Sequence, residues 1–189
     1  RGGNFSGQIT GGGSVNVEGS LILSGVGTYL GGTRLSSGVL YIGNENALGA
    51  GPLTIMGGTG LGFASDITLA NDISITGDFR LVGTDESSFV DLTGNIDTGN
   101  STRTIILDGA ENGTVFAING EITGLAGLNI VDTSQGAPAT LVLGGSTGNT
   151  FMGGVTIYED TTVEFAKSSG FAAPGGANIQ EGGRLVINN

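Results

Sequence analysis

The chain has 189 residues, of which 39 are glycine and three are proline, and it contains neither cysteine nor histidine. The lack of cysteine excludes a disulfide scaffold and thiol chemistry. Seventeen acidic residues against six basic ones give a formal charge of −11. The cations are scattered singly, at Arg1, Arg34, Arg80, Arg103, Lys167 and Arg184. A nucleic acid is not an expected partner, since that needs clustered cations.

The first block, residues 5–56, is built from short triplets in which two apolar residues flank a variable one. The triplets are Val15–Val17, Leu21–Leu23, Leu40–Ile42 and Leu53–Ile55. A period of two predicts strands whose outer members face a core and whose middle member faces away. Glycine, asparagine, aspartate and serine separate the triplets, and these residues are typical of tight corners.

The second block, residues 57–115, shows the spacing of these strands most clearly. Three triplets begin at residues 67, 73 and 79, which are six residues apart. Six residues per side and three sides per turn give a coil of roughly 18–22 residues, as in a parallel β-helix. The length of the chain then predicts about nine rungs.

The third block, residues 116–187, repeats the first. Residues 7–11 match 120–124, residues 15–17 match 128–130, residues 21–23 match 141–143, and residues 28–32 match 150–154. The offset grows along the block, so insertions fall between strands and never inside them. A stack of small units with variable corners indicates a solenoid.

We therefore predict one all-β domain over residues 1–189: a parallel β-helix with very little helix, two repeat copies (5–56 and 116–187) and spacer rungs (57–115). An antiparallel sandwich is the structural alternative, because short alternating strands suit it too. Two-residue Asp-Gly or Asn-Gly hairpins are scarce, however, and those at 108–109, 112–113 and 119–120 cluster in one stretch. This scarcity favours the solenoid.

The stretch GSLILSGVGTYLGGTRLSSGVLYIGNENALGAGPLTI resembles the passenger-associated strand repeat of bacterial autotransporters. The resemblance rests on Leu21–Gly25, Thr28–Thr33 and Ala47–Gly51, and on ATLVLGGSTGNTFMGGVTI in the second copy. The following SSGFAAPGGANI departs from the pattern of the first copy. The resemblance implies a right-handed parallel β-helix that is secreted and displayed at the bacterial surface.

Enzymatic chemistry in a β-helix would need paired carboxylates about 5–10 Å apart across a cleft. The candidate pairs are Asp85/Glu86, Glu159/Asp160 and Asp91/Asp97. Acidic residues at corners are more often solvated loop residues, and a lyase would also need a basic residue, for which Lys167 is the only lysine. We therefore predict no catalytic residue and no enzyme.

The sequence signals for metal, cofactor and modification sites are equally weak. The stretch Gly57–Leu61 lacks the aspartate of a glycine-rich calcium-binding repeat. Gly11–Ser14 lacks the lysine and helix of a phosphate-binding loop. Glycosylation sequons begin at Asn4, Asn100 and Asn112 and matter only in a glycosylating host. No metal and no cofactor is expected.

An apolar contact stripe is the one candidate binding surface. If the triplets point their outer members inward, four large apolar residues face outward: Ile22, Ile106, Val142 and Val186. Such a stripe can dock a partner or an adjacent subdomain. The alternative is that these β-branched residues reflect strand propensity alone.

The predicted function is an extracellular structural or adhesive module. Its expected partners are other copies of itself, neighbouring rungs of a longer chain, or host and matrix surface molecules. No apolar run approaches the ~18 residues of a membrane helix, so no membrane insertion by this segment is expected. Two alternatives remain open: a fibre subunit that stacks end to end, because both ends interrupt the repeat, and a carbohydrate-active β-helix. Fold alone does not choose among them.

Overall fold

The computed structural model describes residues 3–85 and 88–188, and every regular element in these ranges is a β-strand. The strands form three parallel sheets. The long sheet contains, in spatial order, β1 (Gly3–Phe5), β3 (Leu21–Leu23), β5 (Val39–Ile42), β7 (Gly60–Phe63), β10 (Phe79–Val82), β13 (Arg103–Asp108), β16 (Leu128–Asp132), β18 (Val155–Ile157) and β20 (Ala177–Ile179).

Two shorter sheets complete the triangle. The early sheet contains β2 (Val15–Glu18), β4 (Thr33–Ser37), β6 (Leu53–Ile55), β9 (Ile73–Ile75), β12 (Ile96–Asp97) and β15 (Ile122–Thr123). The late sheet contains β8 (Ile67–Leu69), β11 (Phe89–Leu92), β14 (Val115–Ile118), β17 (Thr140–Gly145), β19 (Thr162–Lys167) and β21 (Arg184–Ile187).

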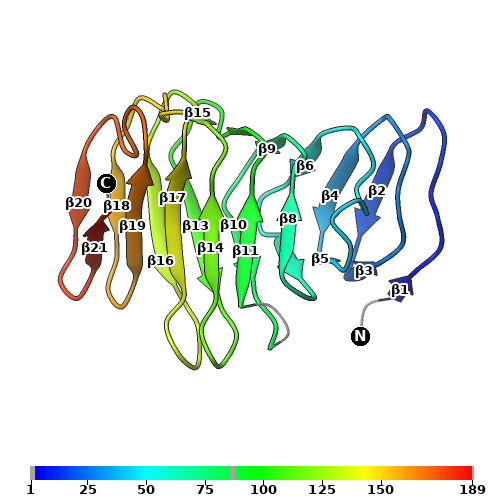
Figure 1. Ribbon diagram of the computed structural model, residues 1–189, viewed down its shortest axis with the longest axis horizontal. Coiled ribbons are helices and arrows are strands. Elements are labelled where there is room, and N and C mark those ends of the chain that lie inside the picture. The colour runs from blue at the N-terminus through cyan, green and yellow to red at the C-terminus, as the bar shows by residue number, and fades with distance from the viewer. Residues whose placement is uncertain (1–2, 86–87, 189) are drawn as a thin grey trace.

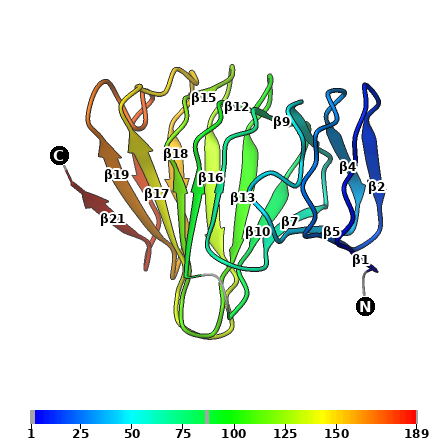
Figure 2. The ribbon, with the colours of Figure 1, turned by 45° about the vertical axis from the view of Figure 1, so that its right-hand side comes forward.

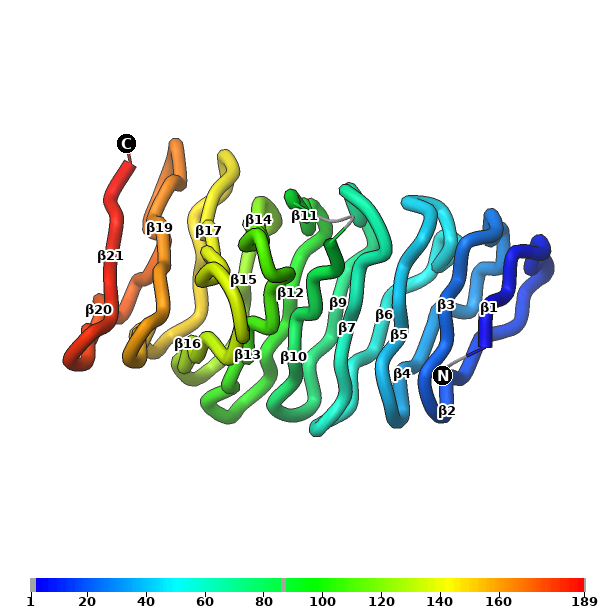
Figure 3. Tube along the Cα trace, turned by 90° about the horizontal axis from the view of Figure 1, so that it is seen from below, coloured from blue at the N-terminus to red at the C-terminus, as the bar shows by residue number. Residues whose placement is uncertain are grey.

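The three sheets wind into one solenoid. In Figure 1 the chain rises along the late sheet, crosses the early sheet at the top and descends along the long sheet behind, while it advances toward the C-terminus. This is a right-handed coil, the sense that parallel crossovers favour. It makes about eight turns, close to the nine predicted, and Figure 3 shows the turns stacked along one axis. The parallel β-helix is confirmed.

The core consists of ladders in which each residue lies against its counterpart in the next turn. In the long sheet Leu40, Leu61, Leu81 and Leu107 are in register and almost fully buried. The other two sheets carry similar inward rows of isoleucine, leucine, valine and phenylalanine. The predicted strand phase is therefore correct along these rows. A turn cannot bury this surface alone, so each turn depends on its neighbours.

Insertions lie at the corners, as the repeat alignment indicates. Two corners that join the long sheet to the late sheet, at residues 109–114 and 133–139, hang below the solenoid in Figures 1 and 2. The Asp132 carboxylate accepts hydrogen bonds from the Ser134 N–H, the Ser134 hydroxyl and the Ala139 N–H. One side chain thus closes the second loop without disturbing the strands.

The two repeat copies occupy different sides of the triangle. Leu21–Leu23 lies in the long sheet, whereas its counterpart Leu141–Leu143 lies in the late sheet. Likewise Val15–Val17 lies in the early sheet and its counterpart Leu128–Ile130 in the long sheet. The second copy is therefore displaced by one side, about a third of a turn around the axis.

One buried contact differs between the copies in a correlated way. Tyr29 and Thr33 are buried in the first copy, and their hydroxyl groups form a hydrogen bond. In the second copy Phe151 and Val155 occupy the matching positions and are fully buried. Burial of Tyr29 raises the pKa of its hydroxyl. A polar pair in one copy thus corresponds to an apolar pair in the other.

Thr33→Val is expected to lower the free energy of unfolding by about 1–3 kcal/mol, because it leaves the buried Tyr29 hydroxyl without its partner. Adding Tyr29→Phe should recover most of this loss, since it recreates the apolar pair of the second copy. Urea unfolding of the wild type and both variants measures the difference. A double variant as unstable as Thr33→Val alone would contradict this interpretation.

Candidate binding surfaces

The four residues of the predicted contact stripe lie on two different sheets. Ile22 and Ile106 are on the long sheet, and Val142 and Val186 are on the late sheet. All four are half-buried, and the residues flanking Ile106 and Val142 are buried. They do not form one stripe, because the second repeat copy is displaced by one side of the triangle. Their role in binding stays a prediction.

Within each sheet the pairs are also separated. Ile22 is in register with Tyr41, whereas Ile106 is in register with Arg80, one outward row away. Val142 and Val186 share a row, but Glu164 lies between them. Ile106 instead lines a shallow groove of about 270 Å³ on the long sheet, together with Val39 and Gly60.

The candidate carboxylates Asp91 and Asp97 lie on two different sheets. Asp91 lies in the late sheet and accepts a hydrogen bond from the Asn119 side chain at 2.7 Å. Asp97 lies in the early sheet and accepts one from the Gly99 N–H at 2.9 Å. The structure thus places these two on different sides of the triangle. Each of them is bound to a neighbouring amide.

The other two pairs lie in turns. Glu159 and Asp160 are exposed in the corner between β18 and β19, and Asp160 has a φ of 57°, which aspartate tolerates in turns. Asp85 is exposed, and its partner Glu86 lies outside the described residues. In the described ranges, no group of three or more aspartate or glutamate side chains could hold a metal ion.

Three aspartates that the sequence analysis did not single out have a structural role. Asp66, Asp72 and Asp78 each precede one strand of a single turn, at its three corners. Their carboxylates accept hydrogen bonds from N–H groups of the next turn: Ser88 and Phe89, Asn95, and Thr104 respectively. The bonds from Phe89 and Ser88 hold the pKa of the Asp66 carboxyl below its usual value. The six-residue spacing of the strands was the signal that could have found them.

Lys167 is buried at the end of β19. Its Nζ donates a hydrogen bond to the Gly120 carbonyl oxygen at 2.9 Å, and it lines a hollow of about 200 Å³ with Phe165 and Phe171. Burial lowers the pKa of Lys167 to about 8, and the charge of Glu121 opposes this effect. Asp91, Asp97, Glu159 and Asp160 do not line this hollow.

The buried ammonium of Lys167 predicts that the protein becomes more stable as pH rises from 8 to 10. In this window the folded state releases the proton, while the unfolded state, with the ordinary lysine pKa, still binds it. The gain should be on the order of 1–3 kcal/mol. Urea unfolding at pH 7, 8, 9 and 10 measures it. Lys167→Met should remove the rise, and an equal rise in this variant would contradict the assignment.

A trough floored by glycine runs along the N-terminal ends of β16, β18 and β20 in the long sheet. Its volume is about 470 Å³, and its floor comprises Gly127, Gly153, Gly154, Gly175 and Gly176. The backbones of successive turns stack here: a Cβ on Gly153 would lie 2.3 Å from the Gly127 nitrogen, and one on Gly175 would lie 2.3 Å from the Gly153 carbonyl carbon. Close stacking therefore requires glycine and leaves a strip without side chains.

One wall of the trough is a polar row on the long sheet. Asn129, Thr156 and Asn178 are in register on three successive strands and point outward. Within the described part of the chain their side chains make no hydrogen bond to protein groups. Among the residues that the structure describes, none that lines the trough is charged.

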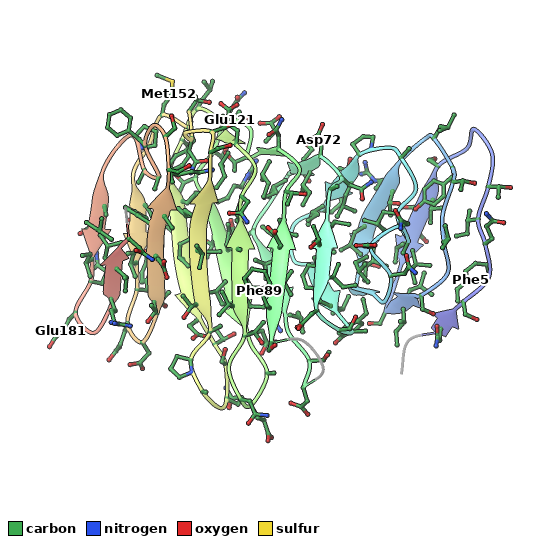
Figure 4. All side chains as sticks on the ribbon, viewed as in Figure 1. Phe5, Asp72, Phe89, Glu121, Met152 and Glu181 are labelled. Atoms are coloured by element: carbon green, nitrogen blue, oxygen red, sulfur yellow. The ribbon has the colours of Figure 1, made fainter. Side chains whose placement is uncertain are left out.

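Two exposed apolar residues stand at the corner that precedes the trough. Leu125 is 61% exposed and Met152 is 71% exposed, and Met152 projects from the top of the molecule in Figure 4. The Met152 N–H donates to the Gly124 carbonyl, which places the two residues on adjacent turns. Sequence analysis missed this corner because register, and not local pattern, brings it together.

The remaining sequence features lie in corners or on the surface. Gly57–Gly58 forms a turn before β7, and Gly11–Ser14 lies in an exposed loop. The Asn4 side chain accepts a hydrogen bond from Ser24, and Asn100 and Asn112 are exposed in turns. Across the described residues, no helix has the length and hydropathy needed to cross a membrane.

Comparison with known proteins gives one curated relative. The chain is 32% identical over 192 aligned residues to the adhesin BmaC autotransporter of Brucella suis biovar 1 (strain 1330). The alignment covers 97% of this chain and 5% of that protein, so the chain spans about a twentieth of its relative. No family model matches the chain, and no solved structure matches it. The chain thus has weak homology to a region of an autotransporter adhesin.

Proposed function

We propose that this chain is an extracellular adhesive segment of an autotransporter passenger, displayed at a bacterial surface, and that it acts by presenting a repetitive outer wall and not by catalysis. The observation that carries the proposal is the similarity to an autotransporter adhesin along 97% of the chain. The fold supports it, because each turn of a β-solenoid presents its outward residues at equivalent positions along the axis. The dispersed carboxylates support a non-enzymatic role.

Adhesion is tested with beads that carry the purified segment. We expect these beads to bind cultured mammalian cells or matrix-coated surfaces at least fivefold more than beads that carry an unrelated protein of similar negative charge. Excess soluble segment should compete this binding away. Beads that carry a Phe116→Ala segment, if it is unfolded, should bind no better than the control beads. Equal binding by the folded segment and the charge-matched control would contradict the proposal.

A second candidate is a subunit that stacks end to end into a fibre, in which Phe5, Ile179 and Ile187 on the outermost strands would meet the next copy. Phe5 is 42% exposed, Ile179 is 47% exposed and Ile187 is 67% exposed. Each is in register with a residue of an inward row. Unpaired strands with such residues can template strand addition.

Sedimentation and electron microscopy test this stacking. Concentration-dependent rods that disappear in an Ile179→Lys/Ile187→Lys variant would support it. A wild-type segment that stays monomeric at millimolar concentration would contradict it, and adhesion by such a monomer would leave the adhesive role intact.

A further inference from the structure

We infer that the glycine-floored trough between Gly127 and Asn178 binds an extended, uncharged glycan chain that runs along the axis of the solenoid. This inference rests on the proposed adhesive function and names the class of ligand that one surface recognises. Three features of the trough carry it: its polar wall, its bare floor with an apolar edge, and the absence of charge.

The polar wall matches the chemistry of sugar hydroxyl groups. Asn129 and Asn178 each present an amide that both donates and accepts hydrogen bonds, and the Thr156 hydroxyl does the same. They lie on successive strands in register, and stacked strands are about 4.7–4.9 Å apart. This spacing is close to the length of one hexose in an extended chain. Each turn can therefore form hydrogen bonds with one sugar ring.

The floor and the corner suit the apolar faces of those rings. The glycines leave the floor free of side chains, so a ring can approach the backbone closely. Leu125 and Met152, which are largely exposed at the adjoining corner, offer apolar contact to C–H groups. Together they place an apolar edge beside the polar wall.

The charge around the trough determines which class of glycan can bind there. The described residues that line the trough are all uncharged, and the chain as a whole carries a formal charge of −11. A sulfated or uronic-acid-rich chain would meet this negative field without a compensating cation. A neutral chain meets no such penalty, and its hydroxyl groups find partners that the protein leaves unused.

The first repeat copy lacks the same site, although it has the matching positions. Asn16, Arg34 and Thr54 correspond there to Asn129, Thr156 and Asn178. The Asn16 side chain is bonded to Glu18 and Ser36, and the Arg34 Nε donates to Ser36. This row is therefore charged and partly occupied. We therefore assign the glycan site to the second copy, and the row of the first copy serves as an internal control.

Calorimetric titration of the full chain tests the inference. The probes are two neutral hexasaccharides, cellohexaose and chitohexaose, and a heparin-derived hexasaccharide. Binding is measured for the wild type, for a trough variant (Asn129→Ala/Thr156→Val/Asn178→Ala) and for a matched variant of the first copy (Asn16→Ala/Thr54→Val). Circular dichroism and thermal unfolding establish that both variants are folded.

We expect the wild type to bind at least one neutral hexasaccharide, the trough variant to bind it at least tenfold more weakly, and the first-copy variant to bind it unchanged. Met152→Ala should weaken binding severalfold. Three results would overturn the inference: no binding of either neutral probe, equal loss in both variants, or preference for the heparin fragment. Beads that still adhere to cells in any of these cases would leave the proposed function standing and reject only this site.

Discussion

Phe116→Ala is expected to lower the free energy of unfolding by about 3–5 kcal/mol, the range typical of a buried aromatic residue truncated in a core. Phe116 lies on β14 in the middle of the late sheet and is fully buried. It is in register with Val90 and Leu141 in the turns on either side. Its ring also packs against Phe63 of the long sheet, with 6.4 Å between ring centroids and an angle of 52° between ring planes.

The cavity left by this substitution would interrupt two sets of contacts at once. The inward row of the late sheet would lose its largest member, and the packing between the late and long sheets would lose its aromatic pair. Because each turn of a solenoid is stabilised by its neighbours, the loss cannot be distributed over distant parts of the chain. The middle of the coil should therefore become the weakest point.

Phe89→Ala on the neighbouring strand is the matched control. Phe89 belongs to β11 of the same sheet, but it is 46% exposed and in register with the outward-facing end of β14. The same chemical change there should cost less than about 1 kcal/mol. Urea unfolding of both variants gives the comparison. Equal losses at the two positions would show that the inward row does not dominate stability.

The sequence predicts the strands and their inward faces well. The triplets that begin at residues 67, 73 and 79 are strands β8, β9 and β10, one on each side of the triangle, and their outer members are buried. A period of two and regular corner residues are local signals, and parallel strands in a solenoid respond to them directly. The fold class could therefore be derived from pattern alone.

The sequence does not predict which side of the triangle a strand occupies. The side that a strand occupies depends on the summed length of all preceding corners, and these corners differ in length between the two repeat copies. Ile22 and Val142 match in the alignment yet lie on the long and late sheets respectively. A stripe of outward residues was therefore not predictable from the alignment.

Contacts between turns also depend on the lengths of the corners that separate the strands. Asn129, Thr156 and Asn178 form one row only because the turns between them differ in length by the amount that keeps the strands in register. No local pattern connects them in the sequence. The most informative surface of the molecule is accordingly one that only the three-dimensional structure reveals.

The inward and outward rows of residues control different properties of the protein. Inward residues are in contact with the turns before and after them, so their substitution changes stability. Outward residues such as Asn129 and Thr156 make no hydrogen bond with the described protein groups, so their substitution can change binding without unfolding the coil. This separation makes a solenoid well suited to adhesion, because the surface can vary while the core is kept.

Gly120→Ala is expected to destabilise the protein by about 3 kcal/mol or more, at or above the upper end of ordinary overpacking. A Cβ on Gly120 would lie 1.9 Å from the Gly94 carbonyl oxygen of the preceding turn. The obstacle is backbone, so no side-chain rotation can relieve it. Gly94 is itself in close contact with the turn below, where its own Cβ would lie 2.1 Å from the Asn71 carbonyl oxygen. The turns of Gly120 and Gly94 would have to separate to admit one methyl group, and the turn of Asn71 limits how far Gly94 can move.

Gly12→Ala provides the control for this substitution, because a Cβ on Gly12 would meet nothing within 4 Å. That variant should be neutral, or more stable by up to about 1 kcal/mol, since alanine reduces the entropy of the unfolded chain. Thermal and urea unfolding of the two variants side by side separate the cost of close stacking from the general cost of replacing glycine. If Gly120→Ala were as stable as Gly12→Ala, the turns at this corner would not be packed backbone to backbone. The abundance of glycine would then need an explanation other than the close approach of successive turns.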